Sequence, residues 1–225
     1  MGQTDFETIA AKLRGALGSP AELHRVSPLN WCHSPLEVLL ATVLTQATND
    51  TNALRAWRNF TARFPEPEMA LEVPPEELAE VIRPAGLAAQ RAAAIRSILE
   101  GVRERFGRFS LDDLADDPAA AWQFLTGLPG VGPKTAACVM LFGMGQPIFP
   151  VDTHIHRVAG RLGWAAPSLD PGKMQRLLSE QVPVPLQAEL HILLLNLGRR
   201  YCRPHQPACA SCPLQADCPA AKNFT

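Results

Sequence analysis

Leu128-Pro129-Gly130-Val131-Gly132-Pro133-Lys134-Thr135 is a turn that ends one short helical pattern, at about 118–126, and begins another, at about 133–143. Glycine provides positive φ and lets backbones approach closely, and proline suits the first position of a helix. Unhindered N–H groups at a helix N-terminus also form an anion site suited to a phosphate. A plain helix–helix connection uses the same residues, so this turn by itself predicts a helical hairpin and leaves its function open.

Helical patterns continue on both sides of the turn, separated by short segments that contain Pro or Gly. The capping box Ser34-Pro35-Leu36-Glu37 predicts an apolar helix that runs to about Gln46, and Thr4-x-x-Glu7 predicts a similar start for the first helix. The other predicted helices cover about 50–63, 75–83, 88–106, 153–162, 171–181 and 186–199. Because no run alternates convincingly as a strand would, the predicted class is all-α.

The length of 225 residues allows one sizeable domain or two small ones. No repeat or low-complexity linker divides the chain, so a second domain would be assembled from its two ends. The N-terminus lacks the pattern of a secretory signal, and the longest apolar stretch, about 136–151, is broken by glycines and Pro147. We therefore expect an intracellular protein that does not span a membrane.

The formal net charge of −1 argues at first against nucleic acid, because nonspecific affinity for DNA comes mainly from Lys and Arg. Charge is unevenly spread, with acidic residues over 66–80 and 112–117 and arginines over 91–108 and 199–203. The helical spacing of the arginines from Arg91 to Arg108 predicts a solvated helix face. Among the 21 basic residues, only four are lysines: Lys12, Lys134, Lys173 and Lys222.

Four cysteines lie near the C-terminus in a segment rich in Pro and Ala, spaced Cys202-x6-Cys209-x2-Cys212-x5-Cys218. Sets of four thiolates bind either a tetrahedral zinc ion or an iron–sulfur cluster, and the ligand count does not choose between them. The two other cysteines, Cys32 and Cys138, lie in apolar segments and are predicted to be core residues.

Taken in order, these motifs resemble the endonuclease III family, whose members are DNA glycosylases with AP lyase activity in the helix-hairpin-helix glycosylase superfamily. The resemblance covers nearly the whole chain, and the cysteine spacing is its most specific part. Its segments are Leu44-Thr-Gln46-Ala-Thr-Asn-Asp-Thr-Asn52, Ile82-Arg-Pro-Ala-Gly86-Leu87-Ala-Ala-Gln-Arg-Ala92, Leu128-Pro-Gly-Val-Gly-Pro-Lys-Thr-Ala136, Val151-Asp152-Thr-His154-Ile-His-Arg157-Val158 and the four cysteines.

The resemblance implies two helical domains with DNA and the active site in the cleft between them. Residues 27–146 would form a six-helix barrel domain with the hairpin, and residues 1–26 with 147–225 would form a cluster domain. The resemblance also implies a [4Fe-4S] cluster and not a zinc ion, because the four C-terminal cysteines have the spacing of the cluster ligands in this family. The implied partner is double-stranded DNA with damaged bases or abasic sites, bound by a monomer in the cytoplasm, associated with the nucleoid in a bacterium.

The implied catalytic residues are Lys134 and Asp152. A lyase that cleaves the sugar needs an amine to form a Schiff base at C1′, which arginine cannot supply because it stays protonated. Burial and the start of a helix at Pro133 would both favour the neutral amine of Lys134. Asp152 precedes a helical pattern and is predicted to be its N-cap, and its carboxylate would stabilise the cationic sugar that develops as the base departs.

The resemblance implies that Gln46 and Leu87 lie on loops that fill the space vacated by an extruded base. Ala85 is smaller than the apolar residue that some relatives place there, so the resemblance leaves the reading of the opposite base and the turnover open. His154 is implied to approach the nucleotide or to pack near a helix start. Arg203 is the one permanent cation between Cys202 and Cys209 and would face DNA. The remaining residues implied to bind DNA belong to the hairpin: Leu128, Gly130, Val131, Gly132 and Thr135.

The predicted function is excision of oxidised pyrimidines from duplex DNA, followed by β-elimination at the abasic site. Two alternatives stay open. An adenine-mismatch glycosylase of the same superfamily is disfavoured by Lys134, since those enzymes lack the lyase lysine. A cluster-bearing DNA-binding or redox-sensing protein without turnover is disfavoured by the presence of both Lys134 and Asp152.

Overall fold

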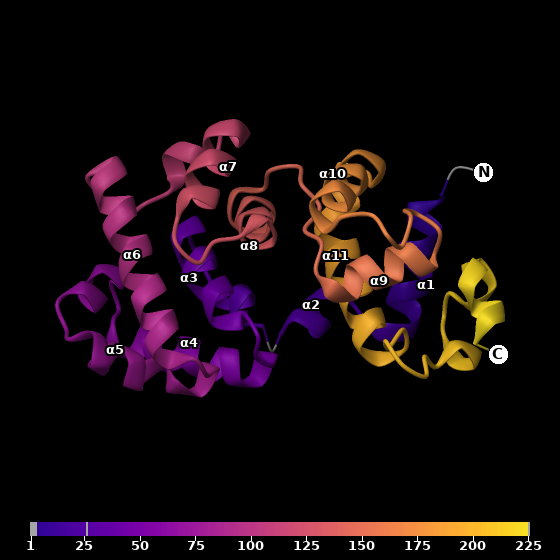
Figure 1. Cartoon of the computed structure of the whole chain (residues 1–225), viewed down its shortest axis with the longest axis horizontal. Coiled ribbons are helices and arrows are strands. Elements are labelled where there is room, and N and C mark those ends of the chain that lie inside the picture. Colours follow the sequence, from indigo (N-terminus) through magenta and orange to yellow (C-terminus); the bar gives the residue numbers. More distant parts are fainter. Residues whose placement is uncertain (1–3, 26, 225) are drawn as a thin grey trace. The chain divides into compact units, whose positions relative to one another are not determined.

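The computed structural model describes residues 4–25 and 27–224, and these form helices and turns without a β-strand. The all-α prediction is confirmed. None of the described helices is long and apolar enough to cross a membrane. Residues 1–3, 26 and 225, which the predicted domain boundaries include, lie outside the described residues. The α-helices in chain order are α1 Phe6–Leu17, α2 Pro20–His24, α3 Pro35–Thr45, α4 Asp50–Arg63, α5 Pro75–Ile82, α6 Ala88–Phe106, α7 Pro118–Gly127, α8 Pro133–Cys138, α9 Thr153–Arg161, α10 Pro171–Gln181 and α11 Val184–Arg200 (Figure 1).

The chain divides into two compact units, Val26–Gln146 and Met1–Arg25 with Pro147–Thr225. In the first, α3 is buried on almost every side, as its continuous apolar sequence requires, and α4, α6 and α8 pack against it. The α8 helix continues into a π-helical turn, Val139–Gly143, that lies against α3. A Cβ on Gly143 would stand 3.0 Å from Cα of Pro35, so this close contact requires glycine.

The second unit joins the two ends of the chain, since α1 and α11 pack side by side (Figure 1). Its core holds Leu13 of α1, Ile155 of α9, Leu178 of α10 and Leu193 of α11, all fully buried. Leu214 belongs to the same core and anchors the C-terminal cysteine segment. Long-range packing therefore holds the ends together, while the cysteine segment itself contains only short 3₁₀ turns, Cys209–Ser211, Gln215–Asp217 and Pro219–Asn223.

Helix caps agree in part with the sequence. Ser34 caps α3 as predicted, accepting a hydrogen bond from the Glu37 N–H, although the Glu37 carboxylate turns to the N–H of His33. The Thr4 prediction was wrong: Asp5 caps α1 and accepts from the N–H of Thr8, because the helix begins one residue later, where Phe6 becomes buried. The complete capping box is Ser19-Pro-Ala-Glu22 at α2, a sequence signal that was missed.

Gly198 marks the closest contact between α9 and α11. A Cβ at this position would stand 2.8 Å from Cβ of His154, closer than real Cβ atoms approach. We expect Gly198→Ala to lower the free energy of unfolding by about 1–3 kcal/mol, because the two helices must move apart. Gly15→Ala in α1 is the control, since its Cβ would meet nothing within 4 Å; it should raise stability by about 0.5–1 kcal/mol. Urea denaturation of both variants measures this, and equal stability of Gly198→Ala and the parent chain would contradict it.

Candidate functional site

The hairpin between α7 and α8 forms as its sequence predicts. Gly130 has φ +79°, a conformation that favours glycine, and the N–H of Val131 donates to the carbonyl of Leu128 at 3.1 Å. A Cβ on Gly130 would lie 3.3 Å from Cβ of Ala94, so the turn packs closely against α6. Gly132 differs, since its φ is −85° and its Cβ would meet nothing within 4 Å. Gly132 therefore leaves the exposed start of α8 open to an approaching molecule without being needed for the fold.

The other hairpin residues divide into buried and accessible ones. The side chains of Leu128, Val131 and Thr135 are buried, so any contact that they make with DNA would use their backbone. Lys134 is half-buried in the first turn of α8. Lys134 thus lies on a backbone whose neighbours Val131 and Thr135 are buried.

Gln46 ends α3 and begins the loop of residues 46–49, called here the Gln46 loop. Its side-chain amide donates to the carbonyl of Gly130 at 3.1 Å and to Oγ1 of Thr135 at 3.2 Å. The next residue, Ala47, has φ +47°, which is unfavourable for a residue with a Cβ. The Gln46 loop is therefore strained at one position and bonded directly to the hairpin.

Leu87 ends the loop of residues 83–87, called here the Leu87 loop, and is the N-cap of α6. Its side chain is 59% exposed although it is apolar, and its φ is +49°. Leu87 is therefore not a core residue. Ala85 is 2% exposed, so its side chain faces the core and not the exposed tip at Leu87.

Arg91 is a buried residue whose environment sequence reasoning missed. A solvated helix face was predicted from Arg91 to Arg108, but Arg91 is 4% exposed. Its guanidinium donates to the carbonyls of Val43, Gln46, Ala85 and Gly86. Burial lowers the pKa of Arg91, yet a guanidinium remains charged at neutral pH. Arg91 therefore ties the Gln46 loop to the Leu87 loop.

Asp152 is the N-cap of α9, and its Oδ1 accepts from the N–H of Ile155 at 2.8 Å, which confirms the capping prediction. His154 in the same turn is half-buried, and its Nδ1 lies 3.1 Å from Nη2 of Arg157. Arg157 also donates to the carbonyls of Gly198 and Cys202. The start of α9 is thus linked by hydrogen bonds to the beginning of the cysteine segment.

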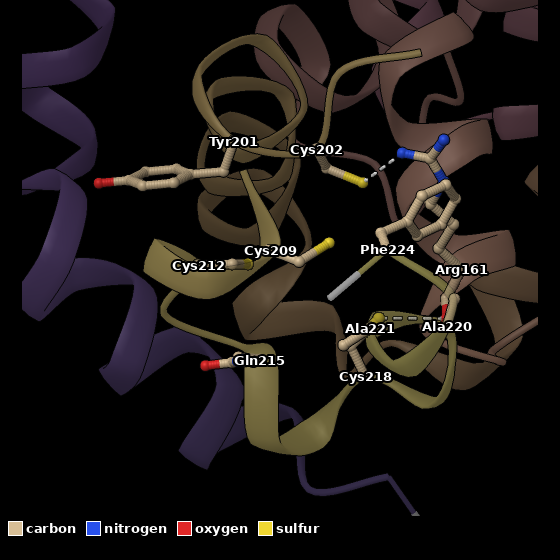
Figure 2. Close-up of a pocket in the computed structure, with 10 residues that line it drawn as sticks. All are labelled: Arg161, Tyr201, Cys202, Cys209, Cys212, Gln215, Cys218, Ala220, Ala221 and Phe224. Carbon is tan, nitrogen blue, oxygen red and sulfur yellow. Dashed lines mark hydrogen bonds between the residues drawn. The ribbon is translucent and has the colours of Figure 1, made fainter. Parts of the chain in front are cut away.

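The four C-terminal cysteines line one pocket (Figure 2). Arg161 and Phe224 border it, with the guanidinium 4.8 Å from the Phe224 ring. Arg161 also donates to Sγ of Cys202 at 3.4 Å, and its carbonyl accepts from Sγ of Cys218 at 3.3 Å. Arg203 is exposed, and its carbonyl accepts a hydrogen bond from Arg161.

The donor set of this pocket is four soft sulfurs. Burial raises the pKa values of Cys212 and Cys218, and the neighbouring cysteines add to the rise. Thiolates held together in this way need a cation to offset their charge. No group of three or more His, Cys, Asp or Glu within 4–25 and 27–224 is arranged to hold a metal ion. Sulfur is nevertheless the preferred ligand of polynuclear iron–sulfur groups, so the chemistry of this donor set suits one.

Comparison with known proteins gives consistent matches. The family model described as HhH-GPD superfamily base excision DNA repair protein matches residues 40–184. Endonuclease III of Thermotoga maritima is 33% identical over 184 residues, covering 82% of this chain and 82% of the relative. Endonuclease III of Bacillus subtilis is 32% identical over 188 residues, covering 82% and 81%. A solved non-covalent endonuclease III–DNA complex superimposes with a TM-score of 0.76 at 27% identity, covering 98% of both chains. The family match includes Gln46, Leu87, Lys134 and Asp152 and ends before the four C-terminal cysteines.

Proposed function

The chain belongs to the HhH-GPD superfamily of base excision DNA repair proteins, and from this premise we propose that it is a bifunctional DNA glycosylase and AP lyase. The proposed substrate is duplex DNA that carries an oxidised pyrimidine or an abasic site. The observation that carries the proposal is the amine of Lys134, half-buried on the short helix that the hairpin positions. Among side chains, lysine supplies the amine that a lyase needs.

In the proposed reaction, the neutral amine of Lys134 attacks C1′ of the damaged nucleotide. The bond between C1′ and the base breaks, and the base leaves with the bonding electrons and takes up a proton. The attached amine gives up a proton, and the C1′–O4′ bond of the sugar then breaks as O4′ takes up a proton, which leaves a protonated Schiff base at C1′. This Schiff base acidifies the C2′ proton, whose loss expels the 3′ phosphate by β-elimination. Water then releases the sugar and regenerates Lys134. The Asp152 carboxylate stabilises the positive charge that develops on the sugar as the base departs.

We propose further that Cys202, Cys209, Cys212 and Cys218 bind a [4Fe-4S] cluster. The support is the cysteine spacing and the pocket that the four residues share. The cluster would cross-link the C-terminal segment, which buries few apolar side chains of its own, and would present Arg203 to the DNA backbone. The reaction proposed above uses no electron from it.

A substrate panel under single-turnover conditions tests the proposed function. Duplexes with an oxidised pyrimidine, an abasic site or adenine opposite 8-oxoguanine are each incubated with excess protein and borohydride. We expect base release from the first duplex and a covalent adduct with the first two. Adenine release alone would favour the mismatch glycosylase, and binding without release or adduct would favour the non-enzymatic alternative.

The affinity for DNA should be weak and depend strongly on salt. A [4Fe-4S] cluster with its four thiolates adds a charge of about −2 to the chain's −1, so binding must rely on a few local cations. We expect the affinity for an abasic-analogue duplex to fall at least about tenfold between roughly 50 and 200 mM salt. Arg203→Gln should reduce the slope of log affinity against log salt by about 1. Fluorescence anisotropy measures both, and an affinity that barely changes with salt would contradict this charge argument.

A further inference from the structure

Arg91 joins two segments that are far apart in the sequence. Two of its acceptors, the carbonyls of Val43 and Gln46, lie at the end of α3. The other two lie in the Leu87 loop, at Gly86 with 2.7 Å and at Ala85 with 3.2 Å. The carbonyl of Val43 also accepts from the N–H of Gln46 at 3.4 Å, but carbonyls in the last turn of a helix lack their regular helical partners, so the guanidinium strengthens the hydrogen bonding at this helix end.

Both loops hold a conformation that needs such support. Ala47 and Leu87 each have a left-handed backbone although each carries a Cβ. This conformation costs free energy and persists only where the surroundings fix it. The five donors of a guanidinium form a rigid planar fork, so one side chain can fix several carbonyls in both loops at once.

A second link extends this network to the hairpin. The main chain of Gln46 accepts from Arg91, and its side chain donates to Gly130 and to Thr135. Thr135 is buried and directly follows Lys134. A continuous set of hydrogen bonds therefore runs from the Leu87 loop, through Arg91 and Gln46, to the turn that carries Lys134.

We propose that Arg91 is a positioning residue that holds the Gln46 loop and the Leu87 loop ready to enter DNA and, through Gln46, aligns them with the Lys134 hairpin. The inference rests on the proposed function, because it assigns these loops to the extrusion of a nucleotide. The exposed apolar tip at Leu87 is the group that would replace the extruded base in the stack. Without this support, the tip would lose conformational entropy when it enters DNA, so it would unstack DNA less often.

Arg96 provides a matched control on the same helix. Its guanidinium also donates to backbone carbonyls, those of Ala70 at 2.9 Å and Val73 at 2.8 Å. These acceptors lie outside both loops and outside the hairpin. Arg91→Lys and Arg96→Lys therefore remove the same kind of anchor from α6, but only the first is expected to affect the loops.

The test uses a duplex with a tetrahydrofuran abasic analogue, which cannot form a Schiff base, opposite 2-aminopurine. Fluorescence of 2-aminopurine rises when it is unstacked, so its amplitude at saturating protein reports loop insertion. We expect Arg91→Lys to reduce this amplitude at least about threefold, and Arg96→Lys to retain most of it. Borohydride trapping on a single-stranded abasic oligonucleotide, where no base pair must open, should fall less in Arg91→Lys than the 2-aminopurine amplitude does.

Ala47→Gly is the second variant, for use if Arg91→Lys folds poorly. It loosens the Gln46 loop without emptying a buried position, and it should lower the amplitude in the same direction. The inference would be overturned if Arg91→Lys and Arg96→Lys lost the same fluorescence amplitude, or if Arg91→Lys or Ala47→Gly kept the full amplitude. The proposed function would still stand in these cases, provided that the parent chain forms its covalent adduct. No fluorescence rise and no adduct with the parent chain would instead overturn the proposed function, and the inference with it.

Discussion

Lys134→Gln is expected to abolish the covalent adduct with abasic DNA and to slow strand cleavage by roughly 10³-fold or more. Glutamine has a similar length and can still donate a hydrogen bond, but its amide nitrogen is not a nucleophile. The side chain is half-buried at the start of α8, and the backbone around it is held by the buried residues Leu128, Val131 and Thr135. The variant should therefore keep its fold and its affinity for DNA while losing the chemistry.

The measurement is borohydride trapping on a duplex with one abasic site, followed by denaturing electrophoresis. Lys173→Gln is the matched control, because Lys173 is also a lysine in the first turn of a helix, α10, although its side chain is exposed. It should trap as much DNA as the parent chain. Undiminished trapping in Lys134→Gln would assign the nucleophile to another amine, and loss of binding along with trapping would mean that the substitution disturbed the hairpin.

Local sequence rules predicted the parts of the site that local rules control. The glycine at position 130 and the proline at position 133 define the hairpin, and Asp152 caps α9 as its place before the helix indicates. Each of these features depends on residues within a few positions of one another. The same rules placed the N-cap of α1 at Thr4 when it is Asp5, because both residue types cap helices and the choice depends on where Phe6 is buried.

Arg91 could not be identified in this way, because its environment is built by residues 43–46 and 85–86. Its helical spacing with Arg96 and Arg103 matches that of a solvated face. Neither the spacing nor the composition indicates that backbone carbonyls of two distant segments accept hydrogen bonds from Arg91. The outward position of Leu87 and the inward position of Ala85 have the same origin, since the positive φ of Gly86 and Leu87 reverses the direction of the chain there. Tertiary packing determines where the side chains of Arg91, Leu87 and Ala85 lie, and the sequence pattern contains no information on that packing.

Cys212→Ala is expected to eliminate bound iron and to lower the melting temperature by about 10 °C or more. The reason is the composition of the cysteine segment, 202–224. Of its residues only Leu214 and Ala221 are buried apolar side chains, and its helical turns are three to five residues long. Apolar burial on this scale is small against the conformational entropy of ordering the segment, so a bound group must supply the difference.

The measurements are iron and acid-labile sulfide content per chain, the visible absorbance of the purified protein, and thermal unfolding followed by circular dichroism. Cys32→Ala is the matched control, because Cys32 lies outside the pocket and its thiol donates only to the carbonyl of Pro28. It should keep its iron and most of its stability. Iron retained in Cys212→Ala would remove this residue from the ligand set. Stoichiometric zinc in the native protein would contradict the proposed [4Fe-4S] cluster, because the four cysteines would then hold a single ion. The inference from the cysteine spacing to iron and sulfide would also be wrong.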